Sequence, residues 1–211
     1  GRRLLVAVSG SIAAVKTPLL VSALVKAGAE VRCLVTPSAA KLVSPLALAS
    51  LSRHRCYTED DGWDSSCSRP LHIELAEWAE LVLLAPLSAT SLSRWSQGSA
   101  DGLLASVLLA CECPVLAAIA INTAMRSHPA VQRNWQIVQT FPGVVPLMPQ
   151  PGLLACDRLG DGRMADPMLI ELAASSLFSR GDTWPVANRD WSGLRLMVSA
   201  GPTVEPIDQA R

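Results

Sequence analysis

The chain has 211 residues, of which 50% are hydrophobic and 17% are charged, and its formal net charge is zero. This composition allows one domain of ordinary size to bury a large core. The neutral balance argues against a dedicated nucleic-acid surface or a basic membrane-binding patch. The longest apolar runs, such as residues 115–121, are too short to span a bilayer. We therefore expect a globular protein that binds neither nucleic acid nor membrane.

In chain order, short apolar runs alternate with helical patterns. Strands are predicted at residues 4–8, 30–36, 81–85, 115–121 and 144–148. Helices are predicted at residues 12–27, in two pieces of 88–110, at 128–140 and at 167–180. Near-continuous apolar strands that alternate with helices indicate a parallel sheet covered on both faces. The predicted fold class is therefore α/β: a Rossmann-like sheet in a flavodoxin-like three-layer sandwich, whose ligands bind where the strands end.

The composition changes after the last predicted helix. Residues 182–193 are polar and contain proline and tryptophan, which is typical of a linker. Residues 194–199 read as a new strand, followed by a Gly-Pro turn, and the chain stops at residue 211. We expect a first domain at 1–181, a linker at 182–193, and the cut-off first strand of a second domain at 194–211.

Small and hydroxyl-bearing residues follow the first three predicted strands. They are Ser9, Gly10, Ser11, Ser38, Ser88, Ala89, Thr90 and Ser91. Free N–H groups at a helix start, together with hydroxyls, bind phosphate well. Any one of these segments by itself is better explained as a helix N-cap. Together they predict a phosphorylated ligand that lies across the edge of the sheet.

Two further residues carry side chains suited to binding or proton transfer. Asn122 follows the fourth predicted strand and can both donate and accept hydrogen bonds, although a turn or cap role is equally open. His72 precedes the third strand and is either an ordinary surface histidine or a general base. His54 and His128 lie in segments that indicate no such role.

Residues 151–164 show no regular apolar period and contain three glycines, so the sequence predicts a loop. This segment carries a thiol, Cys156, and two cations, Arg158 and Arg163. It is either a mobile flap that closes over a substrate or a plain surface loop with a chance cysteine. The other five cysteines form no C-x-x-C pair and no zinc spacing, which favours free thiols in a reducing cytoplasm and no metal site.

In combination, these motifs resemble a known family. They are SGSIAA at 9–14, His-Ile at 72–73, APLSATS at 85–91, Asn-Thr-Ala-Met at 122–125 with His-Pro at 128–129, and Gly-x-Gly-Arg-Met at 160–164. The chain resembles the phosphopantothenoylcysteine decarboxylase domain of the bifunctional coenzyme A biosynthesis flavoproteins, which belong to the homo-oligomeric flavin-containing cysteine decarboxylases. The tail at 196–211 resembles the opening of the fused phosphopantothenate–cysteine ligase domain.

The resemblance implies roles for these residues. FMN would bind through Ser9, Gly10, Ser11, Ser38, Ser88, Ala89, Thr90, Ser91 and the backbone near Ala120. His72 would be the catalytic base, Asn122 would hold the substrate carboxylate, and Cys156 would return a proton. The substrate would contact Asn122, Ala155, Cys156, Asp157 and Arg163.

The implied reaction converts 4′-phosphopantothenoylcysteine to 4′-phosphopantetheine. The substrate thiol is oxidised to a thioaldehyde, CO2 is lost, and the product is formed by re-reduction. The implied assembly is a homo-oligomer, a trimer or a dodecamer, with the flavin at a subunit boundary. The implied location is cytoplasmic. The alternatives are a non-catalytic regulatory module of the same fold, or a related peptidyl-cysteine decarboxylase or flavin-prenylating enzyme.

The chain departs from the family pattern at a few positions near the predicted site. Ile119 and Ile121 precede Asn122, and Arg126 follows Met125. Asp157 follows Cys156 where the family usually has glycine. A carboxylate beside a thiol raises the pKa of the thiol, and aspartate lacks the conformational freedom of glycine. Asp157 is therefore expected to reduce activity or to slow closure of the flap.

Overall fold

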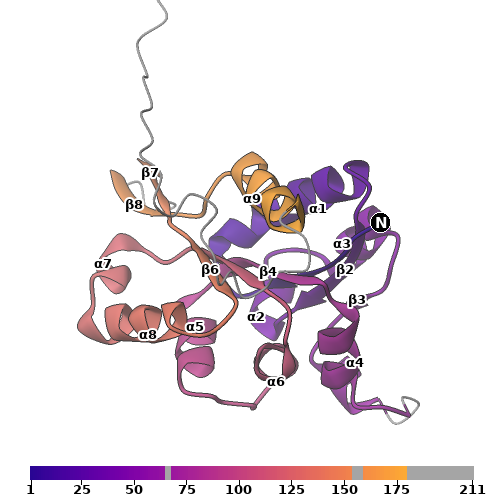
Figure 1. Cartoon of the computed structure of the whole chain (residues 1–211). Helices are drawn as coiled ribbons and strands as arrows, with labels where there is room; N and C mark the ends of the chain where they lie inside the picture. The colour runs from indigo at the N-terminus through magenta and orange to yellow at the C-terminus, as the bar shows by residue number, and fades with distance from the viewer. Residues whose placement is uncertain (65–67, 154–158, 180–211) are drawn as a thin grey trace, which may run out of the picture.

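The computed structural model describes residues 1–64, 68–153 and 159–179. Its centre is a six-stranded parallel sheet in the order β3-β2-β1-β4-β5-β6 (Figure 1). The strands are β1 (Arg3–Val8), β2 (Glu30–Val35), β3 (Cys56–Tyr57), β4 (Leu81–Leu87), β5 (Val115–Ile119) and β6 (Val144–Leu147). Without the two-residue edge strand β3, this is the strand order of flavodoxin. The predicted α/β class is confirmed.

Helices cover both faces of the sheet and make it the middle of three layers. The helical segments are η1 (Ile12–Lys16), α1 (Thr17–Lys26), α2 (Pro37–Ala40), α3 (Pro45–Ser52), η2 (Asp60–Trp63), α4 (Leu71–Trp78), α5 (Ala89–Ser96), α6 (Leu103–Ala110), α7 (Thr123–Arg126), α8 (Pro129–Gln139) and α9 (Pro167–Ser179). Helices α1, α3 and α9 pack on one face. Helices α4, α5, α6 and α8 pack on the other.

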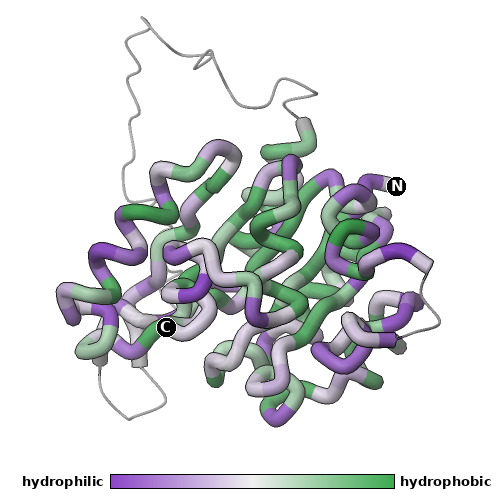
Figure 2. The backbone as a smooth tube through the Cα atoms, turned by 90° about the horizontal axis from the view of Figure 1, so that it is seen from below, coloured by the Kyte–Doolittle hydropathy of each residue, from purple (hydrophilic) through white to green (hydrophobic). Residues whose placement is uncertain are grey.

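Alternation along the central strands explains why there are two cores. In β1, Leu4, Val6 and Val8 contribute to one hydrophobic cluster. Leu5 and Ala7, which point the opposite way, contribute to the other. Every residue of β4 is buried, which explains why this strand reads as a continuous apolar run rather than an alternating one. Figure 2 shows this apolar character running through the middle of the molecule.

The structure corrects some predicted elements. The single helix predicted at 12–27 is a 3₁₀ segment, η1, followed by α1. Helices α3 and α4 were not predicted, because each has eight residues and starts beside a proline in a sequence without clear apolar periodicity. His72 therefore lies in the first turn of α4 rather than in a connection before a strand.

The prediction of an irregular loop at 151–164 is wrong for both ends of that segment. Strands β7 (Gln150–Leu153) and β8 (Leu159–Arg163) pair antiparallel, with Gly152 opposite Gly160. Glycines at these positions removed the alternating apolar signal by which strands are found. The predicted substrate contacts Ala155, Cys156 and Asp157 lie outside the described residues, as do the predicted linker at 182–193 and the predicted second domain at 194–211.

Within the described ranges, no helix combines the length and the apolar character that a membrane crossing requires.

Candidate functional site at the carboxyl edge of the sheet

The turns after β1 and β4 are tied together by one buried hydroxyl. Ser9 is fully buried, and its Oγ donates to the carbonyl of Pro86 at 2.7 Å. The same oxygen accepts from the backbone N–H of Ser88, also at 2.7 Å. Thr17 adds a second link, because its hydroxyl donates to the carbonyl of Ala85 at 3.1 Å. The predicted cofactor residue Ser9 thus uses its hydrogen-bonding capacity within the fold, where it links the turns that follow β1 and β4.

Replacing Ser9 by alanine is expected to lower the free energy of unfolding by about 1–3 kcal/mol, because the buried Ser88 N–H loses its partner. The measurement is chemical unfolding of the purified protein. Ser50→Ala is the matched control, since Ser50 is exposed and donates only to a carbonyl of its own helix α3. Equal stability of the two variants would show that the buried Ser9 hydroxyl does not stabilise the two turns.

Other polar groups at this edge remain closer to solvent. Ser11 is half-buried and donates to the carbonyl of Ala120 at 2.9 Å, so the turn after β1 also contacts the end of β5. Ser38 and Thr90 are exposed. A Cβ on Gly10 would lie 2.5 Å from Cβ of Ser38, so only glycine permits this close approach of the β1 turn to α2. The hydroxyls predicted from separate strand ends therefore lie along one edge.

Ser88 and Ser91 belong to the start of α5. The Ser88 hydroxyl accepts from the backbone N–H of Ser91 at 3.4 Å and is the N-cap of the helix. Both residues are buried, whereas Ala89 is half-buried. The interpretation of this segment as a helix N-cap is therefore confirmed. The first turn of α5 lies at the carboxyl edge of the sheet.

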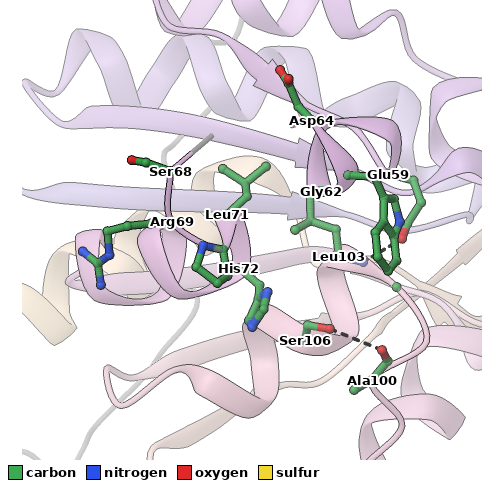
Figure 3. Close-up of a pocket in the computed structure, with 13 residues that line it drawn as sticks. Glu59, Gly62, Asp64, Ser68, Arg69, Leu71, His72, Ala100, Leu103 and Ser106 are labelled. Atoms are coloured by element: carbon green, nitrogen blue, oxygen red, sulfur yellow. Dashed lines mark hydrogen bonds between the residues drawn. The ribbon is translucent and has the colours of Figure 1, made fainter. Parts of the chain in front are cut away.

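His72 lines a cavity of about 660 Å³ between η2, α4 and α6. Figure 3 shows its side chain extending from α4 toward Ser106 on α6. Leu71 and Leu103 supply apolar wall, while Glu59 supplies a carboxylate. The structure therefore places His72, half-buried, in a hollow large enough for a small organic group.

Glu59 holds this cavity in shape and was missed by the sequence analysis. Its Oε1 accepts from the backbone N–H of Leu103 at 2.9 Å, which satisfies a free donor at the start of α6. Glu59 also lines a small neighbouring hollow with Thr36 and Ser91, so the His72 cavity adjoins the hydroxyl-bearing edge. A separation of 44 residues between Glu59 and Leu103 left no local signal for this cap.

Asn122 begins the short helix α7 after β5. Its Oδ1 accepts from the backbone N–H of Ala124 at 3.0 Å, so Asn122 is the N-cap of α7. The residue is nevertheless exposed. Met125, on the same turn, is 53% exposed. The cap hydrogen bond therefore fixes the orientation of the Asn122 side chain at a position that solvent can reach.

The β7–β8 hairpin is anchored on this α7 segment. Gly162 is buried so closely that a Cβ would lie 2.2 Å from the carbonyl oxygen of Ile121. Arg126 also pairs with Asp161, and the hydrogen bond from Arg126 lowers the pKa of Asp161. Because the pKa is depressed in the folded state, the pair stabilises above the ordinary aspartate pKa and its contribution is lost as pH falls through the lowered pKa. The predicted substrate contact Arg163 ends β8 and is exposed.

Replacing Gly162 by alanine is expected to destabilise the protein by about 1–3 kcal/mol, because a backbone carbonyl cannot yield to the added methyl group. Unfolding by urea and the rate of proteolysis within the hairpin are the measurements. Gly62→Ala is the control, since its Cβ would meet a Leu103 methyl at an ordinary 3.6 Å. If the Gly162 variant unfolded and was cleaved in the hairpin like the wild type, the close contact between Gly162 and Ile121 would not hold the hairpin in place.

His72 and Asn122 do not meet within one chain. Helices α4 and α7 lie on opposite sides of the molecule in Figure 1. One chain therefore brings His72 to a cavity and Asn122 to the base of the hairpin, in two separate places. Among the described residues, no group of three or more His, Cys, Asp or Glu side chains is arranged to hold a metal ion.

A parallel sheet with hydroxyl-bearing turns at its carboxyl edge is typical of α/β proteins that bind nucleotides or flavins. The model of the Flavoprotein family matches residues 1–173, and the chain belongs to this family.

Curated relatives extend beyond this chain. A protein of Bacillus subtilis named coenzyme A biosynthesis bifunctional protein CoaBC is 39% identical over 210 residues, which cover all of this chain and 50% of the relative. The protein of the same name from Escherichia coli K12 is 37% identical over 212 residues, again 100% of this chain and 50% of the relative. The chain thus spans about half the length of the curated relatives that it matches.

Solved structures agree with the fold. A cysteine-to-serine mutant of PPC decarboxylase, complexed with pantothenoylaminoethenethiol, superposes with a TM-score of 0.79 at 33% identity, covering 84% of this chain and 98% of the other. The FMN-binding protein AtHal3 superposes with a TM-score of 0.76 at 34% identity, covering 85% and 97%.

Proposed function

We propose that this chain is the FMN-dependent decarboxylase half of a bifunctional protein, acting on 4′-phosphopantothenoylcysteine to give 4′-phosphopantetheine. The observation that carries the proposal is the cavity around His72 beside a hydroxyl-bearing carboxyl edge, in a fold that superposes on a PPC decarboxylase over 98% of that enzyme. The relatives' names support the pathway, since they belong to coenzyme A biosynthesis.

The donor set at the carboxyl edge fits FMN. Hydroxyls of Ser11, Ser38 and Thr90 and the helix starts of η1 and α5 are suited to a phosphate and to polar ring atoms. Gly10 lets the backbone approach closely. In the proposal, Ser9 and Ser88 position these groups rather than releasing their own buried hydrogen bonds. FMN, when bound, supplies the two-electron oxidation and reduction of the substrate carbon–sulfur unit.

His72 is proposed as the general base of this reaction. A histidine accepts and returns a proton near neutral pH. The apolar wall of Leu71 and Leu103 limits water around the imidazole, while the Glu59 cap fixes α6 opposite it. In this role the His72 side chain takes the proton released as the substrate thiol is oxidised.

Asn122 is proposed to hold the substrate carboxylate. Its cap bond to Ala124 uses Oδ1 as acceptor, and the amide nitrogen is the natural donor to a carboxylate. The anchored hairpin next to it carries Arg163 as a further cation. Cys156, which falls between β7 and β8 in sequence, is proposed to return the last proton to the product.

A second copy of the chain is proposed to complete each site, in a trimer or a dodecamer built from trimers. The separation of α4 from α7 supports this, because neither place alone offers both His72 and Asn122. Ile12, Val15 and Leu19 are 53–69% exposed on η1 and α1 and provide an apolar surface for assembly.

Mixing two variants that are each strongly impaired at subsaturating substrate tests the shared site directly. If His72→Asn and Asn122→Asp subunits are co-expressed with different tags and mix at random, about a quarter of the sites combine an intact His72 with an intact Asn122. In doubly purified trimers, which contain both variants, one site in three has this combination, so recovery of about a third of wild-type activity is expected, falling toward a quarter in a dodecamer. Mixed oligomers that are no more active at subsaturating substrate than the single variants would overturn subunit sharing without touching the decarboxylase proposal.

The decarboxylase proposal is tested by the visible spectrum of the protein and by product analysis. We expect a yellow protein that converts 4′-phosphopantothenoylcysteine to 4′-phosphopantetheine and CO2, detected by mass spectrometry. A peptide with a C-terminal cysteine is the competing substrate, and its preferential turnover would favour a peptidyl-cysteine decarboxylase. A yellow protein inert toward both substrates would favour a regulatory flavin-binding module.

The remaining assignments follow from the same proposal. Residues 182–193 would link this domain to a phosphopantothenate–cysteine ligase domain that begins at 194–211. A cytoplasmic location fits the free thiols of the four described cysteines, Cys33, Cys56, Cys111 and Cys113.

A further inference from the structure

Two cysteines with no part in the proposed reaction lie side by side on the amino-terminal edge of the sheet. Cys111 follows the last residue of α6, and Cys113 lies two residues before β5. Their Sγ atoms are 3.1 Å apart, and both residues are half-buried. A disulfide bond has an S–S length of about 2.05 Å, so a shift of about 1 Å would join them.

The surroundings favour Cys111 as the attacking sulfur. The contact with the Cys113 sulfur lowers the pKa of Cys111, while burial and the charge of Glu112 raise it. The same contact with Cys111, followed by burial, raises the pKa of Cys113. The lowered pKa favours Cys111 as the sulfur that reacts first, and the adjacent Cys113 sulfur can then displace the group bound to it, as in other dithiol pairs.

A second pair in the same chain provides an internal contrast. Cys33 and Cys56 face each other across β2 and β3, but they are only 0% and 8% exposed. Burial raises the pKa of both thiols, that of Cys56 to about 12. The two pairs differ in their access to solvent and in the pKa shift of the less shifted thiol, which is lowered for Cys111 and raised for Cys56.

We propose that Cys111 and Cys113 form a reversible redox pair that exchanges with low-molecular-weight disulfides such as oxidised glutathione. The Cys111 thiolate attacks one sulfur of the glutathione disulfide and expels one glutathione thiolate. The Cys113 thiol then gives its proton to the expelled glutathione thiolate, and its sulfur attacks Sγ of Cys111. The second glutathione leaves as a thiolate, so two electrons pass to the reagent as the protein S–S bond forms.

The small ring closed by residues 111–113 makes this disulfide easily reduced, since strained disulfides are the labile ones. Helix α6 connects the pair to the cavity, because Leu103 at its start lines the cavity around His72 and Cys111 follows its end. Oxidation therefore acts on the helix that forms one wall of that cavity.

The test equilibrates the full-length native protein with a series of reduced-to-oxidised glutathione ratios, alkylates the remaining thiols, and analyses peptides by mass spectrometry. In the wild type, we expect the 111–113 peptide to be two hydrogens lighter and unalkylated, while Cys33 and Cys56 stay alkylated. In Cys113→Ser, glutathione should remain on Cys111 at roughly a hundredfold higher occupancy, because the oriented resolving thiol is gone. In Cys111→Ser, Cys113 should stay free of glutathione.

Two results would overturn the proposal. A glutathione adduct that persists on wild-type Cys111 would show that Cys113 does not resolve it. A 111–113 peptide that remains fully alkylated at the most oxidising ratio would show that the pair does not exchange. Both are read from the wild-type protein, so they hold even where a variant folds poorly.

Discussion

Replacing His72 by asparagine is expected to lower kcat by about 10²–10⁴-fold, the range over which a positioned general base acts. Asparagine keeps a polar side chain of similar size in the half-buried first turn of α4, so the fold and the cavity should persist. What is lost is the group that takes the proton from the substrate thiol. The measurement is the rate of CO2 release at saturating substrate.

His54→Asn is the matched control. His54 is exposed, and its Nε2 lies 4.0 Å from a carboxylate oxygen of Glu30, outside the cavity. The control should retain wild-type kcat, and both variants should keep the wild-type flavin absorbance and midpoint of unfolding. If His72→Asn turned over at more than a tenth of the wild-type rate, His72 would not be the base.

Replacing Asn122 by aspartate is expected to lower kcat/KM by roughly 10²–10³-fold, since a charge-assisted hydrogen bond of about 1.5–3 kcal/mol becomes a like-charge repulsion. Aspartate is as good an N-cap as asparagine, so the bond from the Ala124 N–H and the start of α7 are retained. The effect should therefore fall on substrate binding, with KM rising more than kcat falls.

Asn122→Ser separates the loss of the amide donor from the repulsion by an added negative charge. Serine also caps a helix, but it removes the amide donor without adding charge, so its loss should lie between the wild type and aspartate. Serine and aspartate variants with equal activity would show that no carboxylate is held here. A change in the midpoint of unfolding of either variant would instead assign the loss to α7.

The sequence predicted the layered fold because its central strands are buried on both faces. Residues 81–85 form a continuous apolar run that no helix period explains, and the structure extends this strand to Leu87. The short helices α3 and α4 were not predicted, because their own sequences carry no clear helical pattern. Each of α3 and α4 completes about two turns, and packing against α1 or α6 stabilises such helices more than their own sequence does.

The site was harder to predict than the fold, because residue type does not reveal the direction of a hydrogen bond. Ser9 after a strand reads as a ligand contact, yet its hydroxyl bonds Pro86 and Ser88 of the neighbouring turn. The role of Glu59 depends on a helix start 44 residues away. The distance between His72 and Asn122 follows from the order of the strands, which motifs at strand ends do not encode.

Both edges of the sheet are poor templates for another strand. At one edge β3 has two residues, and at the other β6 carries Pro146, which has no amide hydrogen to offer a ladder. Copies of this chain therefore have little opportunity to join edge to edge into open fibrils. Any association between copies would have to use the helical faces, where the fit of side chains and not the pairing of backbones decides which surfaces join.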